Sequence, residues 1–100
     1  MTQYTVVFSP EARDDLLQLY RFIAEHSDEG RAIGYIERIE ACCNSLSIFP
    51  HRGTPRDDLF LGLRVVGFER RVAIAFHVGP GMVTVDRILY GGRDLGLLSR

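Results

Sequence analysis

The run Tyr4-Thr5-Val6-Val7-Phe8, followed at once by Ser9-Pro10-Glu11, decides how this chain starts to fold. Aromatic and β-branched side chains alternate along the first five positions, which predicts a strand over residues 3–8. The triplet after it supplies a side-chain cap, a ring with a preset φ and a carboxylate near the positive end of a helix. The sequence therefore predicts a strand that passes directly into a helix.

Two apolar stripes at helical spacing follow this start. The segment Ser27-Asp28-Glu29-Gly30 separates them with cap and turn residues, and Phe49-Pro50 ends the second. Two amphipathic helices joined by so short a turn predict an antiparallel hairpin. The stripes consist of Ala12, Leu16, Leu19, Tyr20 and Ile23 in the first helix and of Ala32, Ile36, Ile39, Cys43 and Leu46 in the second.

The last third of the chain has the alternation of three strands, at residues 63–68, 71–78 and 82–90. The middle strand has one expected core face and one face that we expect the helices to leave uncovered. The core face holds Val72, Ile74, Phe76 and Val78, and the other holds Arg71, Ala73, Ala75 and His77.

The last strand changes phase along its length. Val83 and Val85 match an inward phase, but Ile88 and Tyr90 have the opposite one. This indicates either a β-bulge or a strand end that is covered from both sides. Both interpretations leave Arg87 and Tyr90 near the functional end of the sheet.

Composition agrees with one compact unit. One hundred residues, of which 46% are hydrophobic and 25% charged, predict a single globular domain over residues 1–100. The fold class that we expect is α+β. It is a small, mainly antiparallel four-stranded sheet with an N-terminal two-helix hairpin on one face, in the order β-α-α-β-β-β.

The charge balance and the scattered reactive side chains exclude several classes of site. A net charge of −1 argues against binding to a phosphate backbone, so we expect no direct nucleic-acid binding by the chain alone. All twelve basic residues are Arg, which reflects either genomic base composition or selection for bidentate contacts. Adjacent Cys42 and Cys43 form no metal-ligand pattern, and we expect neither a metal nor a cofactor. No signal peptide or membrane span is recognisable, so we expect a cytoplasmic protein with no membrane partner.

The order and spacing of these pieces resemble the ParE/RelE superfamily of bacterial toxins, and the ParE-type plasmid stabilisation toxins in particular. The resemblance covers nearly the whole chain. It rests on Ser9-Pro10, Asp14-Asp15-Leu16, Leu46 with Phe49-Pro50, Gly53, the triplet Gly62-Leu63-Arg64, and Arg87-Ile88-Leu89 followed by Gly92-Arg93-Asp94.

The resemblance implies the toxin half of a type II toxin–antitoxin pair that acts by binding DNA gyrase. Binding without a reaction requires an exposed arginine-rich patch with an aromatic anchor. The target-binding candidates are Arg64, Arg87, Tyr90 and Arg93. A structural alternative is that Arg64 and Arg87 pair with Asp86, Asp94 or Glu69 and hold the strands together, and the two roles are compatible.

Two other functions stay open on the same scaffold. RelE-like relatives cleave messenger RNA on the ribosome, which requires a base, cations and an acid to converge. The catalytic candidates in that case are Arg64, Arg71, His77 and Tyr90. The third possibility is an inactive family member that acts only in operon autoregulation with its antitoxin.

The resemblance also implies a cognate antitoxin, ParD-like or similar, encoded beside the toxin gene. A flexible antitoxin tail offsets its ordering cost only by burying a large apolar area. The antitoxin-binding candidates are Leu17, Phe22, Phe60, Leu61, Val66 and Phe68, although the same residues would also serve to complete the core of the monomer.

Overall fold

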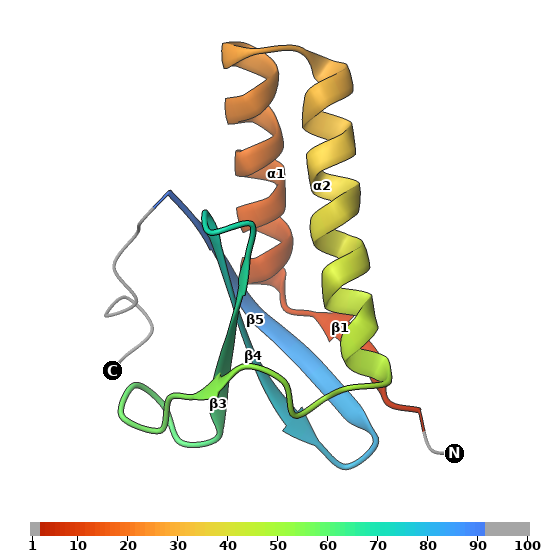
Figure 1. Ribbon diagram of the computed structural model, residues 1–100, viewed down its shortest axis with the longest axis vertical. Helices are drawn as coiled ribbons and strands as arrows, with labels where there is room; N and C mark the ends of the chain where they lie inside the picture. The colour runs from red at the N-terminus through yellow and green to blue at the C-terminus, as the bar shows by residue number, and fades with distance from the viewer. Residues whose placement is uncertain (1–2, 92–100) are drawn as a thin grey trace.

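The computed structural model describes residues 3–91, and it confirms the predicted α+β class (Figure 1). The two helices stand side by side, and in this view the turn that joins them projects beyond the ends of the strands. The elements are β1 (Thr5–Phe8), α1 (Pro10–His26), α2 (Glu29–Asn44), the 3-10 helix η1 (Ser45–Ser47), β2 (Thr54–Pro55), β3 (Leu63–Phe68), β4 (Val72–Gly79) and β5 (Met82–Tyr90).

The sheet has five strands where the sequence predicted four. Their order is β1-β5-β4-β3-β2, with one parallel pair, β1 with β5, and three antiparallel pairs. The additional strand is β2, a two-residue segment that pairs with Arg64 and Val65. Two residues are too short to show an alternating pattern, so only the backbone pairing reveals this strand.

Helix α1 begins where the sequence predicted. The Ser9 hydroxyl oxygen accepts a hydrogen bond from the Ala12 N–H at 3.0 Å, and Pro10 is the first helical residue. The same hydroxyl donates to the Asp86 carbonyl at 2.8 Å. The cap therefore fixes the start of the helix and also attaches it to the middle of β5.

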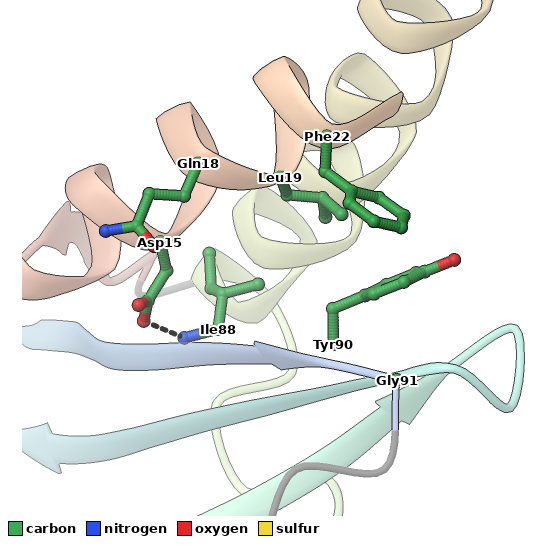
Figure 2. Close-up of a pocket in the computed structure, with 7 residues that line it drawn as sticks. All are labelled: Asp15, Gln18, Leu19, Phe22, Ile88, Tyr90 and Gly91. Carbon is green, nitrogen blue, oxygen red and sulfur yellow. Dashed lines mark hydrogen bonds between the residues drawn. The ribbon is translucent and has the colours of Figure 1, made fainter. Parts of the chain in front are cut away.

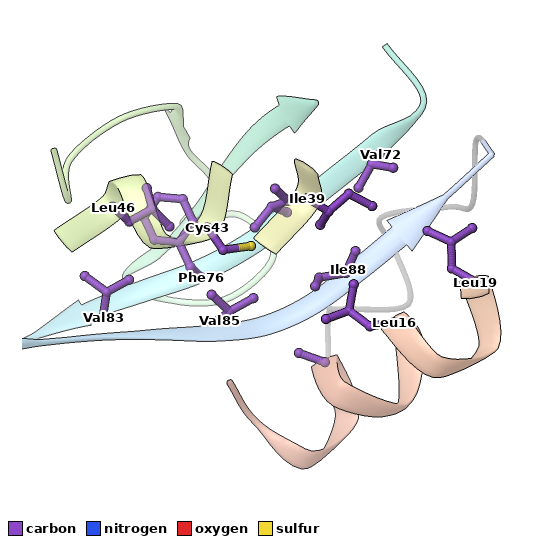
Figure 3. Packing of buried hydrophobic residues seen from close by; sticks show 12 residues of the cluster. Leu16, Leu19, Ile39, Cys43, Leu46, Val72, Phe76, Val83, Val85 and Ile88 are labelled. Atoms are coloured by element: carbon purple, nitrogen blue, oxygen red, sulfur yellow. The ribbon is translucent and has the colours of Figure 1, made fainter. Parts of the chain in front are cut away.

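The core lies between the helix hairpin and one face of the sheet (Figure 3). Val72, Ile74 and Phe76 are buried there, as predicted, and Val78 packs against them while partly exposed. The opposite face is less open than expected, because Ala75 is fully buried and Leu89 is 2% exposed. Ala73 and His77 are half-buried on that face, and Arg71 is exposed.

Strand β5 contains a bulge, which is one of the two interpretations that its change of phase left open. Ala75 pairs with Arg87 and Phe76 pairs with Val85, so Asp86 is an extra residue on β5. One inserted residue moves all later side chains to the opposite face. Val83 and Val85 before the bulge and Ile88 after it consequently all join the core.

Glycine is required at Gly53, where the loop after the helices approaches β3. Its φ is +77°, and a methyl group added there would overlap the Val65 carbonyl. Gly62 has a φ of +85°, but an added methyl group would meet no atom within 4 Å.

We therefore expect Gly53→Ala to lower the free energy of unfolding by about 3 kcal/mol through backbone strain plus steric overlap. Gly62→Ala is the matched control, and strain alone should lower it by about 1 kcal/mol. Urea unfolding monitored by circular dichroism measures both, and equal losses would contradict the close approach at Gly53.

Candidate functional site

A cleft opens between the flank of α1 and the end of β5 (Figure 2). Its volume is about 480 Å³. We call it the Tyr90 cleft, because the Tyr90 ring extends from β5 beneath the Phe22 side chain of α1. It is lined by Asp15, Gln18, Leu19 and Phe22 from α1, by Ile88 and Tyr90 from β5, and by Gly91 directly after β5.

Asp15 ties the two sides of the Tyr90 cleft together. Its carboxylate accepts hydrogen bonds from Arg87 Nε at 2.8 Å, from Arg87 Nη2 at 3.0 Å and from the Ile88 N–H at 2.9 Å. The residue is 9% exposed, and hydrogen bonding to Asp15 raises the pKa of Arg87. A buried carboxylate is stable only when it is paired and hydrogen-bonded, and both conditions hold here.

A second cleft, of about 470 Å³, lies between α2 and the start of β4. We call it the arginine cleft. Tyr90 lines both clefts, and its ring centroid is 6.1 Å from that of Phe22 and 6.3 Å from that of Tyr35. The arginine cleft is lined by Ile23, Ser27, Gly30, Arg31, Gly34, Tyr35, Arg38, Glu69, Arg71 and Tyr90.

Two of the predicted target-binding arginines have internal partners. Arg64 donates to the carbonyl of Arg52 at 3.0 Å and also to those of His51 and Gly53, so it holds the loop before β2. Arg87 is held by Asp15, as described above. Tyr90 borders both clefts, and Arg93 lies outside the described residues.

Arg64 and Arg87 form internal contacts, but not with the partners that the structural alternative named. Neither Arg64 nor Arg87 pairs with Asp86 or Glu69, and Asp94 is not among the residues described. Asp86 instead accepts a hydrogen bond from His77 Nδ1 at 2.7 Å. Glu69 accepts from Arg38 Nε at 3.2 Å.

The four nuclease candidates do not share one pocket. Arg71 and Tyr90 both line the arginine cleft. Arg64 opposes Phe76 on β4 whereas Tyr90 opposes Val72, a separation of about 13 Å along the strand. His77 follows Phe76 directly and so points to the opposite face of the sheet.

The antitoxin candidates differ in exposure. Phe22 is 49% exposed and lines the Tyr90 cleft, whereas Leu17 is 45% exposed and lies about 140° around the helix from it. Phe60 and Leu61 are exposed in the loop before β3. Val66 and Phe68 are partly buried against the core, in agreement with the alternative that they complete it.

The sequence left the roles of Asp15, Tyr35 and Arg38 unassigned. Asp15 has a recognisable signal, because it is a charged residue on the buried side of an apolar helix stripe, next to Leu16 and Leu19. Tyr35 and Arg38 have none, since their contacts with β3 and the β3–β4 turn depend on the tertiary arrangement.

Residues 3–91 contain no cluster of three or more histidine, cysteine or acidic side chains arranged to hold a metal ion. Over the same residues no helix combines the length and the apolar character needed to span a membrane.

The sequence matches the family model described as the ParE toxin of type II toxin–antitoxin system, parDE, over residues 6–95. The chain belongs to the ParE toxin family. Its fold is similar to that of a chain from the chromosomal ParDE TA system from P. aeruginosa, with a TM-score of 0.78, 19% identity, and coverage of 89% of this chain and 97% of the other.

A chain from the toxin-antitoxin complex RelBE2 from Mycobacterium tuberculosis is also similar, with a TM-score of 0.60 and 23% identity. The match covers 90% of this ParE-family toxin and 93% of the other chain. A search of the curated proteins finds no match. The superfamily predicted from the sequence is therefore confirmed.

Asp15→Asn tests the link between α1 and β5. We expect it to lower the free energy of unfolding by about 3 kcal/mol, because Arg87 then lacks its counter-charge and the amide cannot accept all three hydrogen bonds. Asp14→Asn, at an exposed neighbouring position, should change it by less than about 0.5 kcal/mol. Chemical denaturation of both variants provides the measurement, and similar stabilities would show that the buried pair contributes nothing.

Proposed function

We propose that this ParE-family toxin inhibits DNA gyrase by binding it in the cytoplasm, and that a cognate antitoxin encoded beside it neutralises the toxin. The observation that carries the proposal is the separation of Arg64, His77 and Tyr90 over two faces and two ends of the sheet. RNA cleavage requires a base, a cation and an acid around one phosphate. An inhibitor that acts by binding has no such requirement.

In this proposal Tyr90 is the aromatic anchor of the target surface, together with Arg93. Arg64 and Arg87 contribute indirectly, because Arg64 fixes the loop at 51–53 and Arg87 fixes the end of β5. Aromatic side chains that are partly exposed beside a cleft supply much of the free energy of binding in protein complexes. Tyr90 has this position.

The proposed antitoxin surface is centred on Phe22. The cleft beside it offers apolar area from Leu19, Ile88 and Tyr90. The exposed Phe60, Leu61 and Leu17 extend the apolar surface elsewhere on the molecule. A disordered tail that wraps around the toxin would bury several such positions at once.

Purified toxin should stop gyrase from supercoiling DNA and should cause cleaved DNA to accumulate. In a purified translation mixture that contains the toxin, messages should stay intact and translation should continue. His77→Asn should inhibit gyrase as strongly as the natural protein, because the amide can still bond to Asp86 and the residue takes no part in binding. Cut transcripts that disappear with His77→Asn would establish the nuclease instead. Unaffected gyrase and unaffected translation would favour a role in autoregulation alone.

Phe22→Glu should weaken antitoxin binding by at least about tenfold, because it places a charge at the centre of the proposed apolar contact. Ile33→Glu is the matched control, with similar exposure but on α2, outside the cleft and outside the proposed antitoxin surface. Titration of each variant with the antitoxin gives the affinities. Equal losses with Phe22→Glu and Ile33→Glu would contradict a contact centred on Phe22.

A further inference from the structure

The arginine cleft collects positive charge beside aromatic side chains. Arg31, Arg38 and Arg71 line it together with Tyr35 and Tyr90, and Arg31 Nε lies 3.5 Å from Asp28 Oδ2. Gly34 faces the same space, and a methyl group added there would lie 3.9 Å from Arg38 Nη1. Glycine in the interior of a helix lowers the stability of that helix. Gly34 therefore leaves space in the arginine cleft at a cost in stability that the fold alone does not require.

Glu69 already places a carboxylate at one of these arginines. Arg38 donates to it from Nε at 3.2 Å and from Nη2 at 3.5 Å, and both side chains are about half exposed. The Arg38 guanidinium carbon also lies 5.1 Å from the centre of the Tyr35 ring. An exposed ion pair of this length is weak, so another carboxylate can replace Glu69 at Arg38.

The turn that carries Glu69 is strained. Glu69 and Arg70 have φ values of +49° and +63°, in a region where glycine and asparagine are preferred. Both are central residues of the turn that joins β3 to β4, and a two-residue hairpin turn of this type requires positive φ at both positions. The turn thus fixes the backbone of Glu69, the residue that pairs with Arg38.

A hydrogen-bonding group in the cleft lining also lacks a partner. The Tyr35 hydroxyl is buried and makes no hydrogen bond with any residue from 3 to 91. Burial raises the pKa of Tyr35, so the hydroxyl keeps its proton and stays a potential donor. Because the hydroxyl is hidden from solvent, an oxygen of a partner would satisfy it only after neighbouring side chains had moved.

The arrangement of the rings favours a peptide over a nucleic acid. Tyr35 meets Tyr90 at an interplanar angle of 88° and Phe68 at 63°, so the rings are packed edge to face against each other. A stack of bases requires open ring faces, whereas apolar side chains of a peptide pack against ring edges equally well.

We propose that the arginine cleft binds an acidic, partly apolar peptide segment of a partner protein, and that a carboxylate of this segment replaces Glu69 at Arg38. Under the proposed function, the antitoxin is the partner protein and its tail supplies this acidic segment. The inference depends on that function only for the identity of the partner, because peptide binding is measured without gyrase.

The test is fluorescence anisotropy of a short labelled peptide of alternating glutamate and leucine, titrated with the purified full chain. We expect binding that weakens as salt is added, and binding at least about tenfold weaker when glutamine replaces glutamate in the peptide. Arg71→Ala should weaken binding of the acidic peptide about tenfold. Arg21→Ala, an exposed arginine outside the cleft, should leave it unchanged.

The direction in which Glu69→Gln changes the affinity for the peptide distinguishes competition from a purely structural ion pair. If Glu69 competes with the partner, its removal should tighten peptide binding by about two- to fivefold, whereas a purely structural pair predicts unchanged or weaker binding. Gly34→Leu should abolish binding by filling the cleft, and it should not lower the unfolding midpoint, because leucine is the better helix former.

Three results would overturn the proposal. They are equal affinity for the glutamate and glutamine peptides, weaker or unchanged binding by Glu69→Gln, and preferential binding of a labelled oligothymidylate. Peptide binding without gyrase inhibition would retain this inference and reject the proposed target. Gyrase inhibition without peptide binding would reject this inference and retain the proposed target.

Discussion

The buried carboxylate of Asp15 is the interaction on which the rest of the structure depends. It joins α1 to the last strand across 72 positions of sequence by three hydrogen bonds, two from Arg87 and one from the Ile88 backbone. Removal of either charge would leave the other poorly solvated, so the pair constrains where the helix lies on the sheet. The position of Tyr90, two residues beyond Ile88, follows from this attachment.

The bulge at Asp86 makes that attachment possible. Without the extra residue, Ile88 and Tyr90 would point away from the helices, and the Ile88 side chain would leave the core. The Ser9 hydroxyl bonds to the Asp86 carbonyl, so the helix cap and the bulge stabilise one another. The start of the first helix and the change of phase in the last strand are thus parts of one structural unit.

The resulting surface combines a row of aromatic rings with two clefts. Phe22, Tyr90, Tyr35 and Phe68 form a row of neighbouring rings that runs from α1 past β5 and α2 to β3. A cleft lies on each side of Tyr90, one mainly apolar and one with three arginines. Membership of the ParE toxin family agrees with a surface that recognises other proteins.

The sequence by itself determined the elements that depend on local pattern. Alternation and helical spacing located the strands and helices, and Ser9-Pro10 located the helix start, because each of these signals lies within a few residues. The phase change before Ile88 narrowed the last strand to a bulge or a doubly covered end, and the backbone pairing decided for the bulge. The tertiary structure alone decided the partners of the charged side chains. Arg87 bonds to Asp15 and Arg64 to backbone carbonyls, pairings that depend on how distant segments are packed. The same reason explains β2, the separation of His77 from Tyr90, and the meeting of Arg38 with Glu69, since no local pattern encodes a contact between distant parts of the chain.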